Sequence, residues 1–108
     1  MTLQTRKERE FRRREQDILN AALALFNRDD WQSVTVEQIA REAEIGKGTV
    51  YKHFDSKDEI YARLTLDFLQ GLHDRVGRLD TALPVFEYLR AVIREIWDYH
   101  MERRDYRR

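Results

Sequence analysis

A run of donor-rich side chains between residues 47 and 53 is the part of the sequence best suited to chemistry. Its members are small, basic or able to form hydrogen bonds, namely Lys47, Gly48, Thr49, Tyr51, Lys52 and His53. Val50 and Phe54 lie four residues apart, so they would fix a helix to a core along one narrow seam. Bases in the DNA major groove are told apart by hydrogen bonds, and phosphates attract basic side chains. The run is therefore a candidate DNA recognition helix.

The residues before this run predict a partner helix and a tight turn. Thr35 is a favourable N-cap, and Gln38 stands three residues later, where a capping box takes Glu or Gln. One apolar stripe at helical spacing follows, made of Val36, Ile39, Ala40 and Ala43. The sequence Glu44-Ile45-Gly46 interrupts this stripe. Residues 35–54 thus predict a helix-turn-helix, whose second helix enters the major groove.

Helical periodicity continues on both sides of this motif. It predicts a first helix from about residue 7 to Arg28, a long helix from about Lys57 to Asp80, and a last helix from about Pro84 to Arg103. Ser56 and Glu59 predict a second capping box where the long helix begins. One proline and four glycines leave little room for the turns of a sheet. The predicted fold class is all-α.

Composition narrows the function classes. The 108 residues contain 42% hydrophobic residues, which suits a folded domain, and no cysteine, which excludes disulfides and thiolate metal sites. The absence of an apolar run near the ~18 residues of a membrane span predicts a cytoplasmic protein. The net charge of zero argues mildly against nucleic acid. Basic residues nevertheless gather near the N-terminus, at Arg6, Lys7, Arg9, Arg12, Arg13 and Arg14.

Signatures of catalysis and of cofactor binding are missing from the sequence. It contains no P-loop, no dinucleotide-binding glycine motif, no G-x-S-x-G and no His-Glu-x-x-His. His73 and His100 have no carboxylate or histidine three or four residues away, so no helical metal pair is predicted. We expect no enzyme activity, no cofactor and no metal.

Three blocks of sequence resemble a known family. The three blocks are ILNAALALF, SVTVEQIAREA and GKGTVYKHFDSKDEI. Over about residues 12–64, the chain resembles the N-terminal DNA-binding domain of TetR-type transcriptional regulators, both in residue types and in the spacing between blocks. The resemblance implies a three-helix DNA-binding domain in residues 1–56. Residues 57–108 would be a linking helix and an incomplete ligand-binding and dimerisation domain, with the first helix or two of that regulatory region. Family members run to about twice this length, so a fragment is expected.

The resemblance also implies a mechanism and a set of contacts. The regulator would be a homodimer that binds a palindromic double-stranded DNA operator and is released by a small-molecule effector, most simply as a repressor. The family's DNA contacts carry over to the run Lys47, Gly48, Thr49, Tyr51, Lys52 and His53, and to Thr35 and Lys57. On physical grounds Lys47, Thr49 and Lys52 would read bases, with Lys47 suited to guanine. Thr35, Tyr51, His53 and Lys57 would contact phosphates.

The turn departs from the family pattern. Family members usually carry glycine at the place of Glu44 and serine at the place of Gly46. If the family geometry is kept, Glu44 has a positive φ, which costs a residue with a Cβ about 1–2 kcal/mol.

Each functional interpretation has a plainer alternative. Lysines on a helix are often only a solvated face, and Arg12, Arg13 and Arg14 are read equally well as DNA contacts or as a solvated first turn. The apolar side chains expected to line an effector pocket, most of them plain core, are Phe68, Leu72, Phe86, Leu89, Ile93 and Trp97. The alternative function is a helical protein-interaction module without DNA binding, whose apolar last helix docks a partner.

Overall fold

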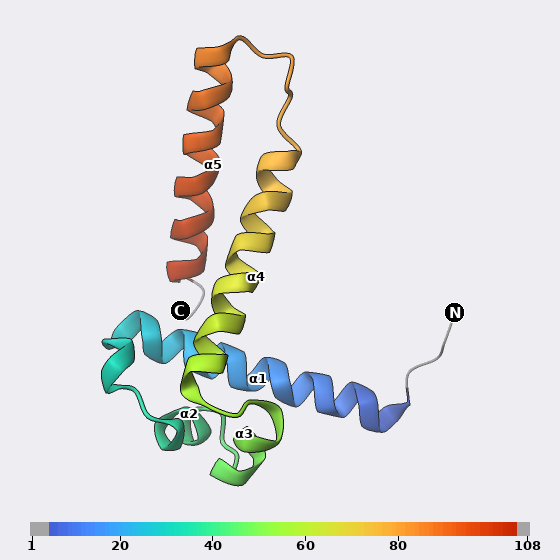
Figure 1. The fold of residues 1–108 in the computed structure, drawn as a ribbon, viewed down its shortest axis with the longest axis vertical. Coiled ribbons are helices and arrows are strands. Elements are labelled where there is room, and N and C mark those ends of the chain that lie inside the picture. Colours follow the sequence, from blue (N-terminus) through green and yellow to red (C-terminus); the bar gives the residue numbers. More distant parts are fainter. Residues whose placement is uncertain (1–4, 106–108) are drawn as a thin grey trace. The chain divides into compact units, whose positions relative to one another are not determined.

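The computed structural model describes residues 5–105 and is all-α, as the sequence predicts (Figure 1). Its elements are α1 (Arg6–Arg28), a 3-10 turn η1 (Trp31–Ser33), α2 (Val36–Glu42), α3 (Lys47–His53), α4 (Lys57–Gly77) and α5 (Val85–Asp105). No strand occurs within the described range. The chain divides into two compact units, of which the first ends at Leu64 and the second begins at Thr65, inside α4.

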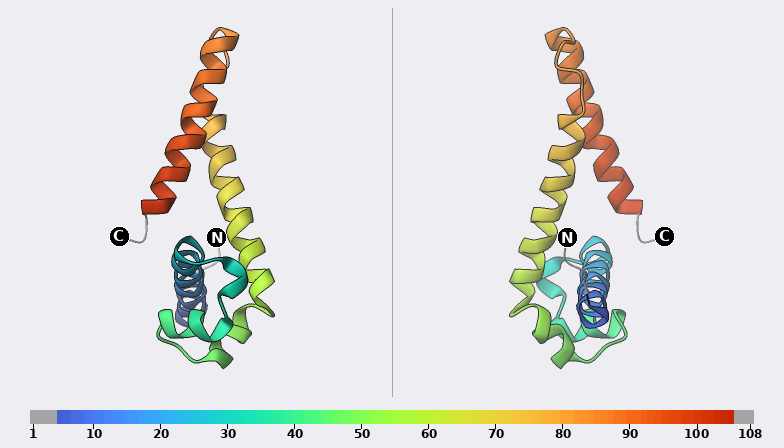
Figure 2. Two further views of the ribbon diagram at one scale, coloured as in Figure 1. Left: turned by 90° about the vertical axis from the view of Figure 1, so that its left-hand side faces the viewer. Right: turned by 90° about the vertical axis from the view of Figure 1, so that its right-hand side faces the viewer.

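The first unit is built around a single apolar core. Helices α2 and α3 both pack against α1, as the two views of Figure 2 show. The buried residues, drawn from every helix of this unit and from the loops, are Ile18, Leu19, Ala21, Ala22, Leu25, Val34, Ile39, Ala40, Val50, Phe54, Ile60 and Leu64. Each large apolar side chain that leaves water completely contributes about 1.5–3 kcal/mol. This core therefore fixes the position of the short helices, which are too short to be stable alone.

Side-chain caps determine where the helices start. The Thr35 hydroxyl accepts a hydrogen bond from the Gln38 amide at 3.1 Å, and the Thr35 amide donates to Gln38 Oε1 at 2.8 Å. This confirms the predicted capping box. At α4 the Glu59 amide donates to Ser56 Oγ at 3.2 Å, but Glu59 Oε2 accepts from the Asp55 amide at 2.9 Å. The second box is thus only half as predicted, because its carboxylate reaches one residue further back.

The long helix α4 ends three residues earlier than its apolar pattern predicts. Beyond Gly77 the amides of Arg78 and Leu79 donate to the carbonyls of Arg75 and Val76, three residues back. Such bonds tighten a helix end and satisfy carbonyls that the helix leaves over.

The second unit is an antiparallel pair formed by residues 65–77 of α4 and by α5 (Figure 1). The rings of Phe68 and Tyr99 lie 4.9 Å apart between the helices. Arg75 donates to the carboxylates of Glu102 at 2.7 Å and Glu95 at 2.9 Å, and this pairing raises the pKa of Arg75. None of the residues that the structure describes in this unit belongs to the buried core.

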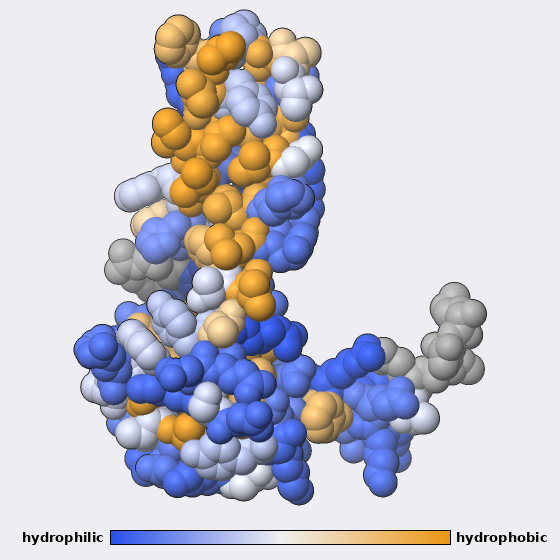
Figure 3. Space-filling model, viewed as in Figure 1, coloured by the Kyte–Doolittle hydropathy of each residue, from blue (hydrophilic) through white to orange (hydrophobic). Residues whose placement is uncertain are grey.

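Instead, the second unit displays apolar residues over both of its helices (Figure 3). The large apolar side chains that remain exposed there are Leu66, Leu69, Val85, Phe86, Leu89, Ile93, Ile96 and Trp97. On α5 they cover one face, while Tyr88, Val92 and Tyr99 form a partly buried stripe beside it, from which Tyr99 contacts Phe68 of α4. Helix α5 is thus apolar on two sides, a pattern typical of a helix that is packed on both.

Candidate nucleic-acid interface

Helix α3 has a buried side, which packs on the core, and an exposed side, which carries most of the predicted recognition residues. Val50 is completely buried, and Phe54, the C-cap of α3, is almost completely buried. This confirms the narrow apolar seam. Lys47, Gly48, Tyr51 and Lys52 are exposed, and Thr49 is half-buried. Thr35, at the start of α2, is exposed too, and its hydroxyl caps that helix. The exposed set supplies ammonium, phenol and hydroxyl donors on one short stretch, which suits contacts with base edges and phosphates.

The turn between α2 and α3 confirms the expectation for Glu44, whose φ is 59°. The Ile45 amide donates to the Ala40 carbonyl at 2.9 Å, and the Glu44 amide donates to the Arg41 carbonyl at 3.1 Å. These two bonds form a Schellman motif, with Glu44 at the position that glycine usually takes. Gly46 then acts as the N-cap of α3 in an extended conformation. The motif sets the direction in which α3 leaves α2.

Lys47, the first residue of α3, is paired across the turn. Its Nζ lies 2.6 Å from Oε1 of Glu37, the second residue of α2, and 5.9 Å from the centre of the Tyr51 ring. The hydrogen bond between the two side chains and their opposite charges lower the pKa of Glu37 and raise the pKa of Lys47. Both side chains are about half exposed, at 51% for Lys47 and 54% for Glu37. The pair is therefore a surface pair, which solvent screens.

The imidazole of His53 points away from the exposed set. Its side chain is only 3% exposed and stacks on Phe11 of α1, with the ring centres 4.0 Å apart. Nδ1 lies 3.6 Å from Glu15 Oε1, which is too long for a hydrogen bond, and among the described residues it has no hydrogen-bond partner. Arg63 Nη1 of α4 lies 3.6 Å from the other oxygen of Glu15. His53 thus anchors the end of α3 on α1.

The ammonium of Lys57 is also engaged within the protein. It donates to the backbone carbonyls of Trp31 at 2.8 Å and Gln32 at 3.2 Å. It also lies 4.7 Å from the centre of the Trp31 ring, where the π face attracts a cation. Lys57 therefore ties the first turn of α4 to η1.

The remaining predicted site residues lie elsewhere. Arg12, Arg13 and Arg14 are exposed in the interior of α1, which already begins at Arg6, so they belong neither to an extended arm nor to a first turn.

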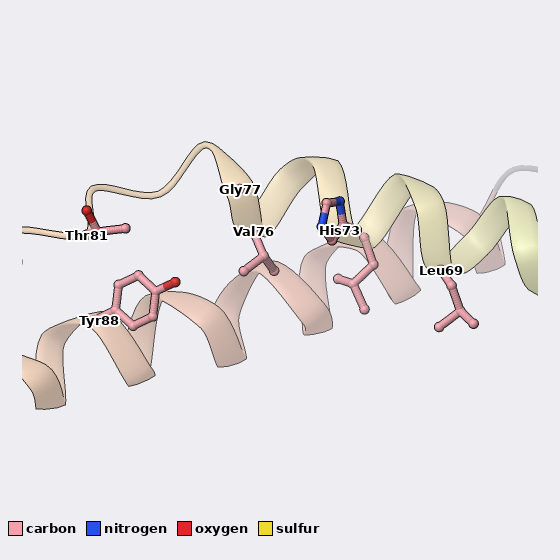
Figure 4. A pocket seen from close by; sticks show the side chains of 7 residues that line it. Leu69, His73, Val76, Gly77, Thr81 and Tyr88 are labelled. Carbon is pink, nitrogen blue, oxygen red and sulfur yellow. The ribbon is translucent and has the colours of Figure 1, made fainter.

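A pocket of about 380 Å³ lies in the second unit, between α4 and α5 (Figure 4). Its lining is Leu69, Leu72, His73, Val76, Gly77, Thr81 and Tyr88. Of the six residues expected around an effector, only Leu72 lines it. Phe86, Leu89, Ile93 and Trp97 lie on the exposed face of α5, and Phe68 packs on Tyr99.

Sequence reasoning missed the acidic partners of these basic groups. Glu37 and Glu15 join different helices, and neither stands at a helical spacing from its partner. Their positions become informative only once the helices are packed together. Among the side chains that the structure describes, in residues 5–103, no group of three or more His, Asp or Glu residues could hold a metal ion, and no described helix is long and apolar enough to cross a membrane.

Comparison with known proteins adds independent information. Residues 18–64 match the family model described as bacterial regulatory proteins, tetR family. The chain is 40% identical over 88 residues to the HTH-type transcriptional regulator HbdR of Aromatoleum sp. strain CIB. The matched region covers 80% of this chain and 37% of HbdR. It is 35% identical over 77 residues to the HTH-type transcriptional repressor KstR2 of Mycolicibacterium smegmatis, covering 70% and 38%.

The fold is similar to that of solved proteins as well. A TetR-family transcriptional regulator from Haemophilus influenzae superposes with a TM-score of 0.67 at 22% sequence identity, over 91% of this chain and 52% of that one. At this identity the likeness concerns the fold. The chain spans less than half the length of the curated relatives it matches.

Proposed function

Because this chain belongs to the TetR family of bacterial regulators, whose family model matches residues 18–64, we propose that it binds an operator in double-stranded DNA and regulates transcription there. Repression is the favoured direction, since KstR2 is named a repressor. The cytoplasm is the proposed site of action, because bacterial operator DNA lies there.

The exposed face of α3 is the observation that carries this proposal. Val50 and Phe54 hold the helix by one side, so that Lys47, Tyr51 and Lys52 remain exposed together on a helix of seven residues. A helix held in this way can enter the major groove, about 12 Å wide, without unpacking the core.

We assign the contacts according to which side chains are exposed. Lys47, Thr49 and Lys52 would read base edges, Tyr51 and Thr35 would contact phosphates, and Gly48 would allow a close approach of the backbone. For His53 and Lys57 the internal contacts favour positioning roles, because the His53 ring stacks on Phe11. The Lys57 ammonium donates to the carbonyls of Trp31 and Gln32.

Dimerisation and effector control are further parts of the proposal. A homodimer bound to a palindromic operator would place two copies of α3 about 34–36 Å apart, or a multiple of that distance. A small-molecule effector would bind in the second unit, where the 380 Å³ pocket has the size of a small-molecule site and combines aliphatic side chains with His73, Thr81 and Tyr88.

Selection of bound duplexes from random DNA, followed by two substitutions, tests the function. Lys47→Ala should relax the preference at one base pair, at a cost of about 1–3 kcal/mol for that pair. Arg94→Ala removes a charge of the same sign from the exposed surface of α5 and should leave the preference unchanged. If wild-type protein shows no salt-dependent affinity for any duplex, the chain is not a DNA-binding protein, and the exposed apolar face of α5 would then favour a protein-interaction module.

A further inference from the structure

The carboxylate of Glu37 lies on the surface that is proposed to face DNA, where a negative charge is unfavourable. Glu37 stands in the first turn of α2 and Lys47 begins α3, so their ion pair lies on the face that α3 would turn toward DNA. Phosphates repel a negative charge there, and non-specific affinity depends on the number of phosphates that basic groups neutralise. The chain thus carries on its DNA-facing surface a group that weakens sequence-independent binding.

The contact restrains the lysine. An ammonium is a compact charge on a flexible stem, and an unrestrained lysine can bind any phosphate within reach. The 2.6 Å contact with Glu37 engages one of the three donors of Lys47 and compensates its charge. Moving Lys47 to a phosphate would break this bond and leave Glu37 beside DNA without its ion-pair partner.

One base pair offers what the two side chains together require. In the major groove guanine presents the acceptors N7 and O6, and the cytosine paired with it presents the N4 donor beside them. The donors that Lys47 has left match the guanine, and Glu37 can accept from cytosine N4. An A·T pair has a different order of donors and acceptors, and a phosphate has no donor for the carboxylate.

We propose that Glu37 is a specificity-determining residue, which acts with Lys47 as a donor and acceptor pair that reads a single G·C base pair and suppresses binding to other DNA. This inference rests on the proposed function and assigns the site one base pair that it recognises. Specificity is a difference between affinities, and a group that opposes the wrong partner increases it as effectively as one that attracts the right partner.

The test compares Glu37→Gln with wild type on the selected operator and on a duplex of random sequence, over a series of salt concentrations. On the random duplex, Glu37→Gln should bind several-fold more tightly, with a salt slope steeper by about one, because Lys47 gains a phosphate contact. On the operator, replacing the G·C pair by A·T should weaken wild type by at least about tenfold and the variant by much less.

Two further proteins make the outcome specific. Glu42→Gln removes the same charge from the exposed end of α2, and it should change neither the salt slope nor the discrimination. In a Lys47→Gln background, Glu37→Gln should no longer steepen the slope. Circular dichroism of each variant verifies that the helices are retained.

The inference is overturned if Glu37→Gln leaves both the slope and the discrimination unchanged, or changes them no more than Glu42→Gln does. In that result the wild-type protein still selects an operator, so the proposed function stands. If the wild-type protein binds no duplex at all, both proposals fail together.

Discussion

At the scale of single residues, Glu44 adopts a backbone conformation that is unfavourable for its residue type. Its φ of 59° lies in the left-handed region, which costs a residue with a Cβ about 1–2 kcal/mol. Glycine avoids this cost but gives up to about 1 kcal/mol back, because it gains freedom in the unfolded chain. Glu44→Gly should therefore stabilise the protein by about 0.5–1 kcal/mol and raise the melting temperature by roughly 2–8 °C.

A matched variant two residues earlier isolates the backbone effect. Glu42 is the last residue of α2, so Glu42→Gly should reduce the free energy of unfolding by about 1 kcal/mol and lower the melting temperature. Thermal unfolding of the two variants should thus move in opposite directions. A fall for both would contradict the left-handed assignment of Glu44.

His53 allows a second prediction at this scale, because its buried ring is an anchor for α3. His53→Phe keeps an aromatic ring on Phe11 and removes a buried nitrogen that has no hydrogen-bond partner among the described residues. We expect it to keep operator affinity within about twofold, since no DNA contact is lost. His53→Ala leaves a cavity and should cost about 2 kcal/mol or more in urea unfolding.

The two measurements separate packing from recognition. A His53→Phe protein with unchanged stability and an affinity that falls alike on all sequences would show that the imidazole binds phosphate. The assignment of His53 as an anchor would then be wrong.

At the scale of elements, Gly71 determines how closely α4 and α5 approach. A Cβ at position 71 would overlap the hydroxyl of Tyr99, whereas a Cβ at Gly77 would meet no atom within 4 Å. Gly77→Ala should be neutral or stabilise the protein by up to about 1 kcal/mol, as alanine favours helix. Gly71→Ala should destabilise it by about 1 kcal/mol, because Tyr99 must leave its contact with Phe68.

The sign of the Gly71 effect should depend on Tyr99. In a Tyr99→Ala background the overlap is gone, so Gly71→Ala should stabilise by up to about 1 kcal/mol. Thermal unfolding followed by circular dichroism measures all four proteins. A destabilisation of equal size in both backgrounds would refute the close contact.

The start of α2 and the buried seam of α3 could be predicted from the sequence, because both depend on neighbours within a few residues. Thr35 with Gln38, and Val50 with Phe54, carry that information locally. The end of α4 could not be predicted in this way, since the apolar pattern continues to Leu79 after helical hydrogen bonding has changed at Gly77.

The candidate site divides along the same line. The exposure of Lys47, Tyr51 and Lys52 follows from the single apolar seam of α3. The position of the Lys57 ammonium depends on carbonyls 25 and 26 residues earlier, and that of His53 depends on Phe11 in another helix. Contacts of this kind arise from packing and leave no trace in local periodicity.

At the scale of the whole chain, all the described residues of the buried core belong to the first unit, and local stability should follow this distribution. Amides in the core segments of α1 and α2 should exchange slowly, because their exposure requires unfolding around Ile18, Leu25 and Ile39. Amides of α5 have no such core and should exchange at least about tenfold faster. Along α4, protection should fall after Leu64. Hydrogen–deuterium exchange with mass spectrometry measures this, and equal protection of α5 and α1 would contradict it.

Each of the two units contains one tryptophan, which can serve as an intrinsic fluorescent probe of that unit. Of its two tryptophans, Trp31 lies in the first unit, beside the Lys57 ammonium and the Tyr61 ring, and Trp97 lies in the second, 63% exposed. An indole that already faces water changes its emission colour little when the chain unfolds, whereas a half-shielded one shifts to the red. Fluorescence of the intact chain should therefore report mainly on the first unit, and a shift of Trp97 to the blue would signal that its apolar face has become covered.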